Sequence, residues 1–189
     1  MKKPKLKPAI FDGVLINDYL ISDTGDFYTI IRNPSRKKDG EQDEKGRYLK
    51  KLKPSITEQG YLYQIIFFPT EAFEYKYALC RTGKGKTGRR KAKIHQLVMQ
   101  TFKPFEKFLP KAINKEDYDK VPESMKIFIR QAFIVNHIDH DKKNNNANNL
   151  EWITTKDNAR KAVKHYGGNF ANAASNDTST AIYKNRRGA

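Results

Sequence analysis

The chain has a single cysteine, Cys80, among its 189 residues. One thiol excludes an intramolecular disulfide and any zinc site built on paired thiolates, so the ligands of a bound metal ion would be oxygen and imidazole. No apolar run approaches the ~18 residues that a membrane-spanning helix needs, and the Lys-rich start lacks the apolar core of a signal peptide. We therefore expect a soluble, cytoplasmic protein without a membrane partner.

Acidic residues are also scarce, because 21 Asp and Glu stand against 37 Lys and Arg, which gives a net charge of +16. A surface field of that sign attracts polyanions by releasing their condensed counterions. Nucleic acid is the leading partner, and a basic surface kept for solubility or for an anionic membrane is the alternative. The length fits one domain of ordinary size plus an appendage, and we expect a loop-rich α+β protein.

The first half of the chain alternates charged segments with runs typical of β-strands. Residues 1–9 alternate lysine with proline, which predicts a flexible basic arm. In the β-rich region 10–104, YLIS and FYTIIR flank Asp23–Asp26, as in a hairpin. We predict a charged loop at residues 33–53, followed by two further strands, GYLYQIIFF (60–68) and FEYKYALC (73–80).

Residues 81–93, RTGKGKTGRRKAK, contain seven basic residues, three glycines and no acid. They predict a mobile cationic loop that contacts a nucleic-acid backbone, and a merely solvated loop is the alternative. A nucleotide-binding P-loop is excluded, because its first glycine would fall at Cys80. We thus expect no nucleotide cofactor. The predicted DNA contacts of this segment are Lys84, Lys86, Arg89, Arg90, Lys91 and Lys93.

An amphipathic helix is predicted for residues 93–102, because apolar side chains recur there at helical spacing and Lys103-Pro104 ends the pattern. His95 lies beside the apolar stripe, where a packing or hydrogen-bonding role is favoured over metal binding. Residues 105–130 read as a connecting segment, and SMKIFIRQAF (124–133) is compatible with either a helix or a strand.

Residues 131–166 form the most informative part of the chain. A β-branched run ends in His137, an Asn-rich polar loop follows, LEWIT (150–154) reads as a second strand, and a helix starts at Thr154 with Asp157 in capping-box spacing. The predicted order is strand, loop, strand, helix. Folded on itself, the hairpin should bring Asn136 and His137 against the second turn of the helix, where Asn158 projects.

Three blocks within this segment carry a family resemblance: VNHID (135–139), NNLEW (148–152) and Asp157-Asn158. They resemble the HNH branch of the ββα-metal (His-Me finger) nucleases, in particular phage and intron HNH homing endonucleases. The upstream text is similar to the NUMOD4-like module found with them. The resemblance implies an α+β fold in which an N-terminal antiparallel β-rich DNA-binding region precedes a ββα-metal nuclease motif at residues 131–166, in a bacterial or phage-infected cell.

The resemblance also implies a reaction and its residues. His137 would be the general base, and Asn149 would pin the loop that holds it. Asn136 and Asn158 would bind one Mg²⁺ or Mn²⁺ ion, and the products of duplex DNA cleavage would carry 5′-phosphate and 3′-hydroxyl ends. Asn136 stands where Asp is frequent and Asn158 where other branches have His, so we expect weak metal binding until phosphate contributes charge.

Further contacts and alternatives accompany this interpretation. Asp139 and His140 are spare metal ligands whose favoured role is to structure the loop. Phosphate contacts on the last helix would come from Arg160, Lys161 and Lys164, with a solvated helix face as the alternative. A catalytically inactive DNA-binding protein that retains the HNH fold and an RNA-binding module remain rival functions. We expect a monomer, leave a dimer open, and interpret residues 167–189 as an irregular basic extension.

Overall fold

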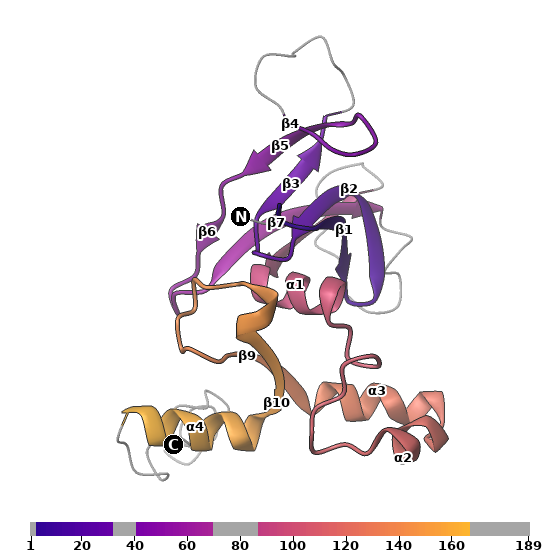
Figure 1. The fold of residues 1–189 in the computed structure, drawn as a ribbon, viewed down its shortest axis with the longest axis vertical. Helices are drawn as coiled ribbons and strands as arrows, with labels where there is room; N and C mark the ends of the chain where they lie inside the picture. Colours follow the sequence, from indigo (N-terminus) through magenta and orange to yellow (C-terminus); the bar gives the residue numbers. More distant parts are fainter. Residues whose placement is uncertain (1–2, 32–40, 70–86, 167–189) are drawn as a thin grey trace, which may run out of the picture.

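The computed structural model describes residues 3–31, 41–69 and 87–166. In these residues antiparallel strands dominate the N-terminal part, and helices alternate with a β-hairpin in the C-terminal part (Figure 1). The expected α+β class, with N-terminal antiparallel strands followed by a ββα unit, is confirmed. The predicted strand at 73–80, the side chains of Lys84 and Lys86, and the extension 167–189 lie outside the described residues.

The first sheet has the strand order β1-β2-β3-β5-β4. Its strands are β1 (Leu6–Phe11), β2 (Val14–Ser22), β3 (Phe27–Ile30), β4 (Glu41–Gln42) and β5 (Tyr48–Leu52). The predicted hairpin is confirmed, because β2 and β3 pair antiparallel with Leu20 opposite Tyr28. The turn between them includes Gly25 at a φ of 91°, a conformation that suits glycine.

Two sequence-based expectations for this sheet are wrong. Residues 6–9 of the predicted flexible arm belong to β1, which tolerates Pro8 because β1 is an edge strand and its register shifts between Pro8 and Ala9. The predicted loop 33–53 contains the β4–β5 hairpin in its described part. In that hairpin, Leu49 is only 2% exposed and Leu52 is partly buried against the core. Two apolar side chains three residues apart do not show the alternation that predicts a strand.

The second sheet consists of β6 (Ser55–Ile56), β7 (Leu62–Pro69) and β8 (Thr87–Lys93). β7 confirms the strand predicted at residues 60–68. β8 corrects the prediction of a cationic loop for residues 87–93, since these residues pair with β7 along their whole length. Long basic side chains are compatible with a strand whose other face is buried, and here Gly88 and Ala92 supply that face.

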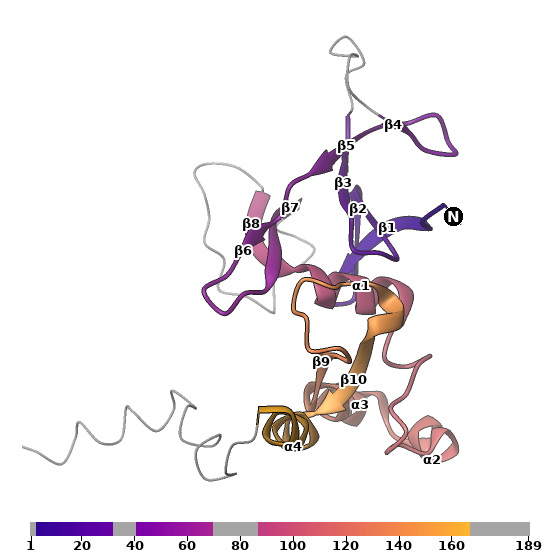
Figure 2. The ribbon, with the colours of Figure 1, turned by 60° about the vertical axis from the view of Figure 1, so that its left-hand side comes forward.

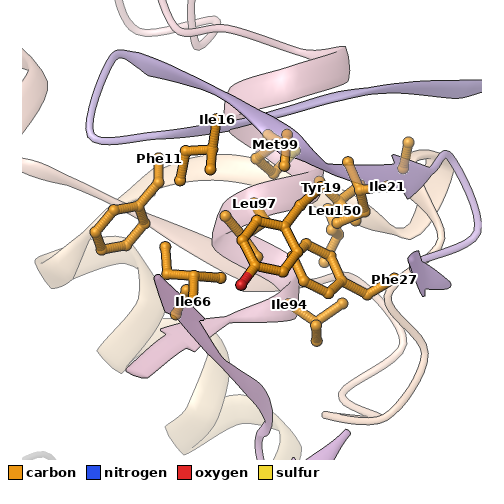
Figure 3. Close-up of a cluster of buried hydrophobic side chains, with 14 of the residues drawn as sticks. Phe11, Ile16, Tyr19, Ile21, Phe27, Ile66, Ile94, Leu97, Met99 and Leu150 are labelled. Atoms are coloured by element: carbon orange, nitrogen blue, oxygen red, sulfur yellow. The ribbon is translucent and has the colours of Figure 1, made fainter. Parts of the chain in front are cut away.

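Helix α1 (Ile94–Phe102) follows β8 directly and confirms the predicted amphipathic helix. It lies between the N-terminal strands and the C-terminal hairpin in both views (Figures 1 and 2). Ile94, Leu97 and Val98 are at most 1% exposed and pack in the main core. Figure 3 shows side chains from β1, β2, β3, β7 and α1 meeting there, together with Leu150 from the C-terminal part.

The C-terminal part begins with α2 (Lys115–Lys120) and α3 (Glu123–Gln131), so the ambiguous segment at 124–131 is helical. It continues with β9 (Phe133–His137), a short 3-10 helix η3 (Ala147–Asn149), β10 (Leu150–Thr154) and α4 (Thr155–Tyr166). The predicted order of strand, loop, strand and helix is confirmed. No helix in the described ranges is long and apolar enough to span a membrane.

The C-terminal unit is not separate from the N-terminal strands. Ala147 and Leu150 belong to the same core cluster as Ile21, Phe27 and Leu97, and α1 contacts β9, β10 and η3. The candidate site is therefore assembled on a core to which both halves of the chain contribute.

Candidate active site

The β9–β10 hairpin separates two neighbouring residues that the sequence assigns to one site. In the antiparallel register His137 lies opposite Leu150, and Asn136 lies opposite Glu151. Successive side chains of a strand point to opposite faces. Accordingly His137 contacts the α1 side, whereas Asn136 lies on the face covered by α4. The expected position of both residues against the second turn of the last helix, at Asn158, stays a prediction.

His137 occupies a largely buried pocket of polar and aromatic groups. His137 is only 4% exposed, and its Nε2 lies 3.1 Å from Oδ1 of Asn145. The ring of His95 from α1 makes an edge contact at 5.1 Å between centroids, and the ring of Tyr61 lies at 6.0 Å. Burial lowers the pKa of His137 below its ordinary value, against the opposing effect of Asn145 and the nearby carboxylates.

The hydrogen bonds of Asn145 determine which ring nitrogen of His137 carries the proton. Asn145 Nδ2 donates to the backbone carbonyl of Lys143, so its Oδ1 faces the imidazole and can only accept. Nε2 of His137 must then be the donor, and the neutral ring presents Nδ1 as the atom able to take a proton. The site thus holds an uncharged imidazole in one tautomer.

The Asn-rich loop is organised by Asn149 and Asp139. Asn149 Oδ1 accepts from the backbone N–H of Asp139 at 3.1 Å, and its Nδ2 donates to Asp139 Oδ1 at 2.8 Å and to the carbonyl of Asn144 at 2.9 Å. Its own carbonyl accepts from the N–H of Ile138, directly after His137. Hydrogen bonds from Asn149 and Asn144 hold the pKa of Asp139 below its usual range. These contacts are of the kind expected from a residue that pins the loop, although the catalytic role of Asn149 stays a prediction.

The turn between β2 and β3 contacts the same loop. The backbone N–H of Ala147 donates to the carbonyl of Asp23 at 2.7 Å. A Cβ atom added to Gly25 would lie 2.7 Å from Cβ of Asn145, closer than real Cβ contacts allow. Gly25 is therefore needed both for its positive φ and for the close approach of Asn145, which in turn holds His137.

On the opposite face of the hairpin, a carboxylate that the sequence interpretation missed lies beside Asn136. Asn136 Nδ2 donates to Glu151 Oε1 at 2.9 Å, and Nζ of Lys161 donates to the same oxygen. Although partial burial acts to raise it, the hydrogen bonds from Lys161 and Asn136 leave the pKa of Glu151 below its ordinary value. The signal was present in the alternation of the two strands, but it required the register that pairs Glu151 with Asn136.

The residues on this face fit a hard divalent cation. Asn136 uses Nδ2 for Glu151, so its carbonyl oxygen Oδ1 is the atom suited to a cation. Asn158 is half-buried on α4 and precedes Lys161 by three residues, which places both on one helix face. Amide and carboxylate oxygens are the ligands that Mg²⁺ and Mn²⁺ prefer. The described residues contain no cluster of three or more His, Cys, Asp or Glu, so the donor set around Asn136 carries little negative charge.

The spare ligands have other contacts in this fold. Asp139 is occupied by the loop hydrogen bonds given above. His140 has a φ of 65° and stacks on His165 of α4, with ring centroids 3.9 Å apart. On α4, Arg160 pairs with Asp157 at 3.1 Å and Lys164 is exposed.

The predicted DNA contacts of β8 lie on two faces of its sheet. Arg89, Lys91 and Lys93 alternate along one face, which is also the face of Phe67 and Tyr63 on β7. Phe67 is 50% exposed, and Nζ of Lys91 lies 5.2 Å from the centroid of the Tyr63 ring. Arg90 points to the other face, between the buried Gly88 and Ala92 and opposite the buried Ile66. Arg90 therefore lies on the other face of the sheet from Arg89, Lys91 and Lys93, and its predicted contact with DNA stays a prediction.

Comparisons with known proteins bear on the C-terminal unit. Residues 121–160 match the family model described as HNH endonuclease. No curated protein matches the chain. One solved structure, described as DNA binding and cleavage by the HNH homing endonuclease I-HmuI, is similar at 20% sequence identity and a TM-score of 0.47, covering 90% of this chain and 64% of that one. The chain thus spans less than two thirds of the length of that protein.

The family match covers α3, the β9–β10 hairpin and the first turns of α4, and so contains all four residues predicted for catalysis and metal binding. The NUMOD4-like module of the N-terminal region stays a prediction. Residues 121–160 of the chain match the HNH endonuclease family, as their resemblance implied.

Proposed function

We propose that the chain is a homing-endonuclease-like HNH enzyme that hydrolyses phosphodiester bonds of duplex DNA and leaves 5′-phosphate and 3′-hydroxyl ends. The observation that supports this most is the arrangement around the hairpin within the family-matched segment. Within that segment, His137 holds an uncharged imidazole in a defined tautomer, and the adjacent Asn136 holds an amide oxygen beside a carboxylate. Hydrolysis needs a proton acceptor for water and positive charge near the phosphate.

His137 is the proposed general base. Its Nε2 is committed to Asn145, so Nδ1 takes the proton of the attacking water. Burial keeps the ring uncharged at neutral pH, which is the form a base must have. Asn149 is the proposed positioning residue, since it ties both residues that follow His137 to the loop. Because His137 is only 4% exposed, we infer that bound DNA shifts the loop enough for water to reach Nδ1.

Asn136 and Asn158 are the proposed ligands of a single Mg²⁺ or Mn²⁺ ion, which when bound supplies positive charge to the phosphate and the leaving oxygen. Glu151 orients the amide of Asn136 by accepting from its Nδ2. Lys161 neutralises Glu151 in the free protein. With most of the ligand set uncharged, metal binding should depend on phosphate oxygens of the substrate.

Double-stranded DNA is the proposed partner, without a nucleotide cofactor. The exposed face of β8 presents Arg89, Lys91 and Lys93, and α4 adds Arg160, Lys161 and Lys164. Lysine and arginine side chains bind the phosphate backbone mainly through charge. Arg90, on the other face of β8, and Lys84 and Lys86, outside the described residues, complete the proposed set.

A second candidate function is DNA binding without cleavage. It is favoured by the burial of His137 and by the pairing of Glu151 with Lys161, because both features keep potential catalytic groups occupied. The two candidates make opposite predictions for the same assay, in which an inactive protein retards DNA and never cuts it.

The test is a nicking assay on supercoiled plasmid with Mg²⁺, with and without EDTA. Wild type should convert the plasmid to relaxed circles, His137→Ala should not, and the exposed loop variant Asn148→Ala is the matched control that should cut like wild type. DNA ligase should reseal the nicks without prior phosphorylation if the ends carry 5′-phosphate. Relaxed circles in equal amount with His137→Ala would remove that residue from the mechanism, and no cleavage by wild type would favour DNA binding alone.

A further inference from the structure

His95 is a buried histidine that the proposed reaction does not use. It lies on α1, is 4% exposed, and carries an Nδ1 atom that has no hydrogen-bond partner among the described residues. Leaving a buried polar atom unpaired is unfavourable, and an apolar ring would fill the same space without that penalty. What distinguishes the position is its neighbour, because the His95 ring meets the His137 ring edge-on with an interplanar angle of 76°.

The hydrogen bond to Asn145 alone does not define the orientation of the His137 ring. A single contact at Nε2 holds one atom, and a ring with free space beside it can tilt until Nε2 leaves Asn145. The rings of His95 and Tyr61 pack against two further sides of the His137 ring, with centroid distances of 5.1 and 6.0 Å. Tyr61 is itself in contact with His95 at 5.0 Å, so the three rings form one cluster. Edge-to-face aromatic contacts of this kind restrict ring orientation.

The charges around the cluster are compatible with two uncharged imidazoles side by side. Lys93 of β8 and Lys142 of the loop place their Nζ atoms 4.8 and 5.0 Å from the Tyr61 ring centroid, and Asp139 and Asp141 lie on the loop beyond His137. Burial, with smaller effects of His137 and Lys93, lowers the pKa of His95 to about 3. His95 therefore adds no positive charge beside the base near neutral pH.

We propose that His95 is a positioning residue for His137, whose buried ring fixes the plane of the His137 imidazole and so directs Nδ1. This inference rests on the proposed function, since direction matters only if Nδ1 accepts a proton. It also extends the nuclease site beyond the matched segment, because α1 precedes residue 121. The part of the chain before residue 121 then supplies His95 and Tyr61 around the catalytic base, and Gly25 next to Asn145.

Three variants test the proposal: His95→Ala removes the ring, His95→Phe keeps a ring of similar shape, and Val98→Ala removes buried volume elsewhere on α1. His95→Ala should lower kcat about 100-fold, the effect of misplacing a catalytic group by roughly 1 Å, with KM within about twofold. His95→Phe should restore kcat to within about threefold of wild type, and Val98→Ala should leave it there. Equal losses of kcat in His95→Ala and Val98→Ala would overturn the proposal, because loss of packing alone would then explain both.

A second measurement does not depend on cleavage. Long-range ¹H–¹⁵N correlation spectra of the free protein, at a pH where both imidazoles are neutral, report the tautomer of His137. Wild type and His95→Phe should show one tautomer with the proton on Nε2. His95→Ala should show a mixture, because a His137 ring that is no longer held by His95 tilts away from Asn145 and loses the bond that selects the tautomer. A single unchanged tautomer in His95→Ala would overturn the proposal even if wild type cuts DNA. If wild type does not cut, the proposed function fails while these spectra still decide the role of His95.

Discussion

Acid should destabilise this protein well above the pH at which carboxylates titrate, because it buries a histidine that cannot take up a proton. The pKa of His95 falls from 6.5 to about 3 in the folded state, chiefly through burial. The unfolded chain binds a proton below about pH 6.5 and the folded chain does not, so the free energy of unfolding falls as pH falls. The free energy of unfolding is therefore not reduced by His95 above pH 6.5, and it falls progressively as the pH is lowered from 6.5 toward about 3.

The magnitude follows from linkage. Each pH unit below the unfolded pKa costs about 1.4 kcal/mol for one such group, so His95 should lower the free energy of unfolding by about 2 kcal/mol between pH 6.5 and about pH 5. His137, whose pKa is also lowered by burial, adds a loss of the same sign. The lowered carboxylate pKa values of Asp139, Asp157 and Glu151 remove stability mainly below about pH 4.5, outside this window.

Urea denaturation followed by the fluorescence of Trp152, the single tryptophan, measures the effect. Trp152 packs edge-on against Phe105, with centroids 5.6 Å apart, so its emission should report loss of the core. With a typical slope of about 2 kcal/mol per molar urea, a loss of about 2 kcal/mol moves the midpoint down by about 1 M. The midpoint should fall by this amount between about pH 7.5 and 5 in wild type.

Two variants separate protonation from packing. His95→Phe keeps the ring but cannot bind a proton, so most of the pH dependence in this window should disappear. Val98→Ala weakens the same helix without a titratable group, so it should lower stability by the same amount at both pH values. If His95→Phe shows the same pH dependence as wild type, the reasoning is refuted, because another group must then be taking up the proton.

Three further predictions follow from the geometry. Gly25→Ala should destabilise the protein by more than Gly13→Ala, as measured by urea midpoint, since both have positive φ but only Gly25 would clash with Asn145, and equal losses would argue against that contact. Asn136→Asp should bind Mn²⁺ more tightly than wild type in calorimetry without DNA, whereas wild type should bind tightly only with DNA present; tight binding by free wild type would contradict this. Lys91→Ala should weaken DNA binding about equally for all sequences. It should also reduce the slope of log binding constant against log salt concentration by about one, and an unchanged slope would remove Lys91 from the interface.

Local patterns in the sequence were sufficient for several elements. The spacing of Ile94, Leu97 and Val98 predicted α1, and the turn residues Asp23–Asp26 predicted the β2–β3 hairpin. The blocks around His137 and Asn149 predicted the ββα unit and its family. Each of these signals depends on residues close in sequence, where backbone hydrogen bonding and side-chain periodicity act directly.

Patterns failed where composition conflicted with pairing. Basic residues 87–93 resembled a loop, yet they form β8 because β7 offers a strand whose buried face matches Gly88 and Ala92. Pro8 argued against a strand, but β1 lies at a sheet edge, where the missing N–H is tolerated. Strand pairing joins segments that are distant in sequence, so the sequence of either segment alone does not predict it.

By itself, then, the sequence determined the α+β class, the family that residues 121–160 match and the residue types that can accept a proton or bind a hard cation. Only the tertiary structure decided that His137 and Asn136 lie on opposite faces of the hairpin, that Glu151 lies beside Asn136, and that His95 lies against His137. The physical reason is that strand register and helix packing bring together side chains distant in sequence. A motif names the groups that can react, and the packing around them sets their charge and direction.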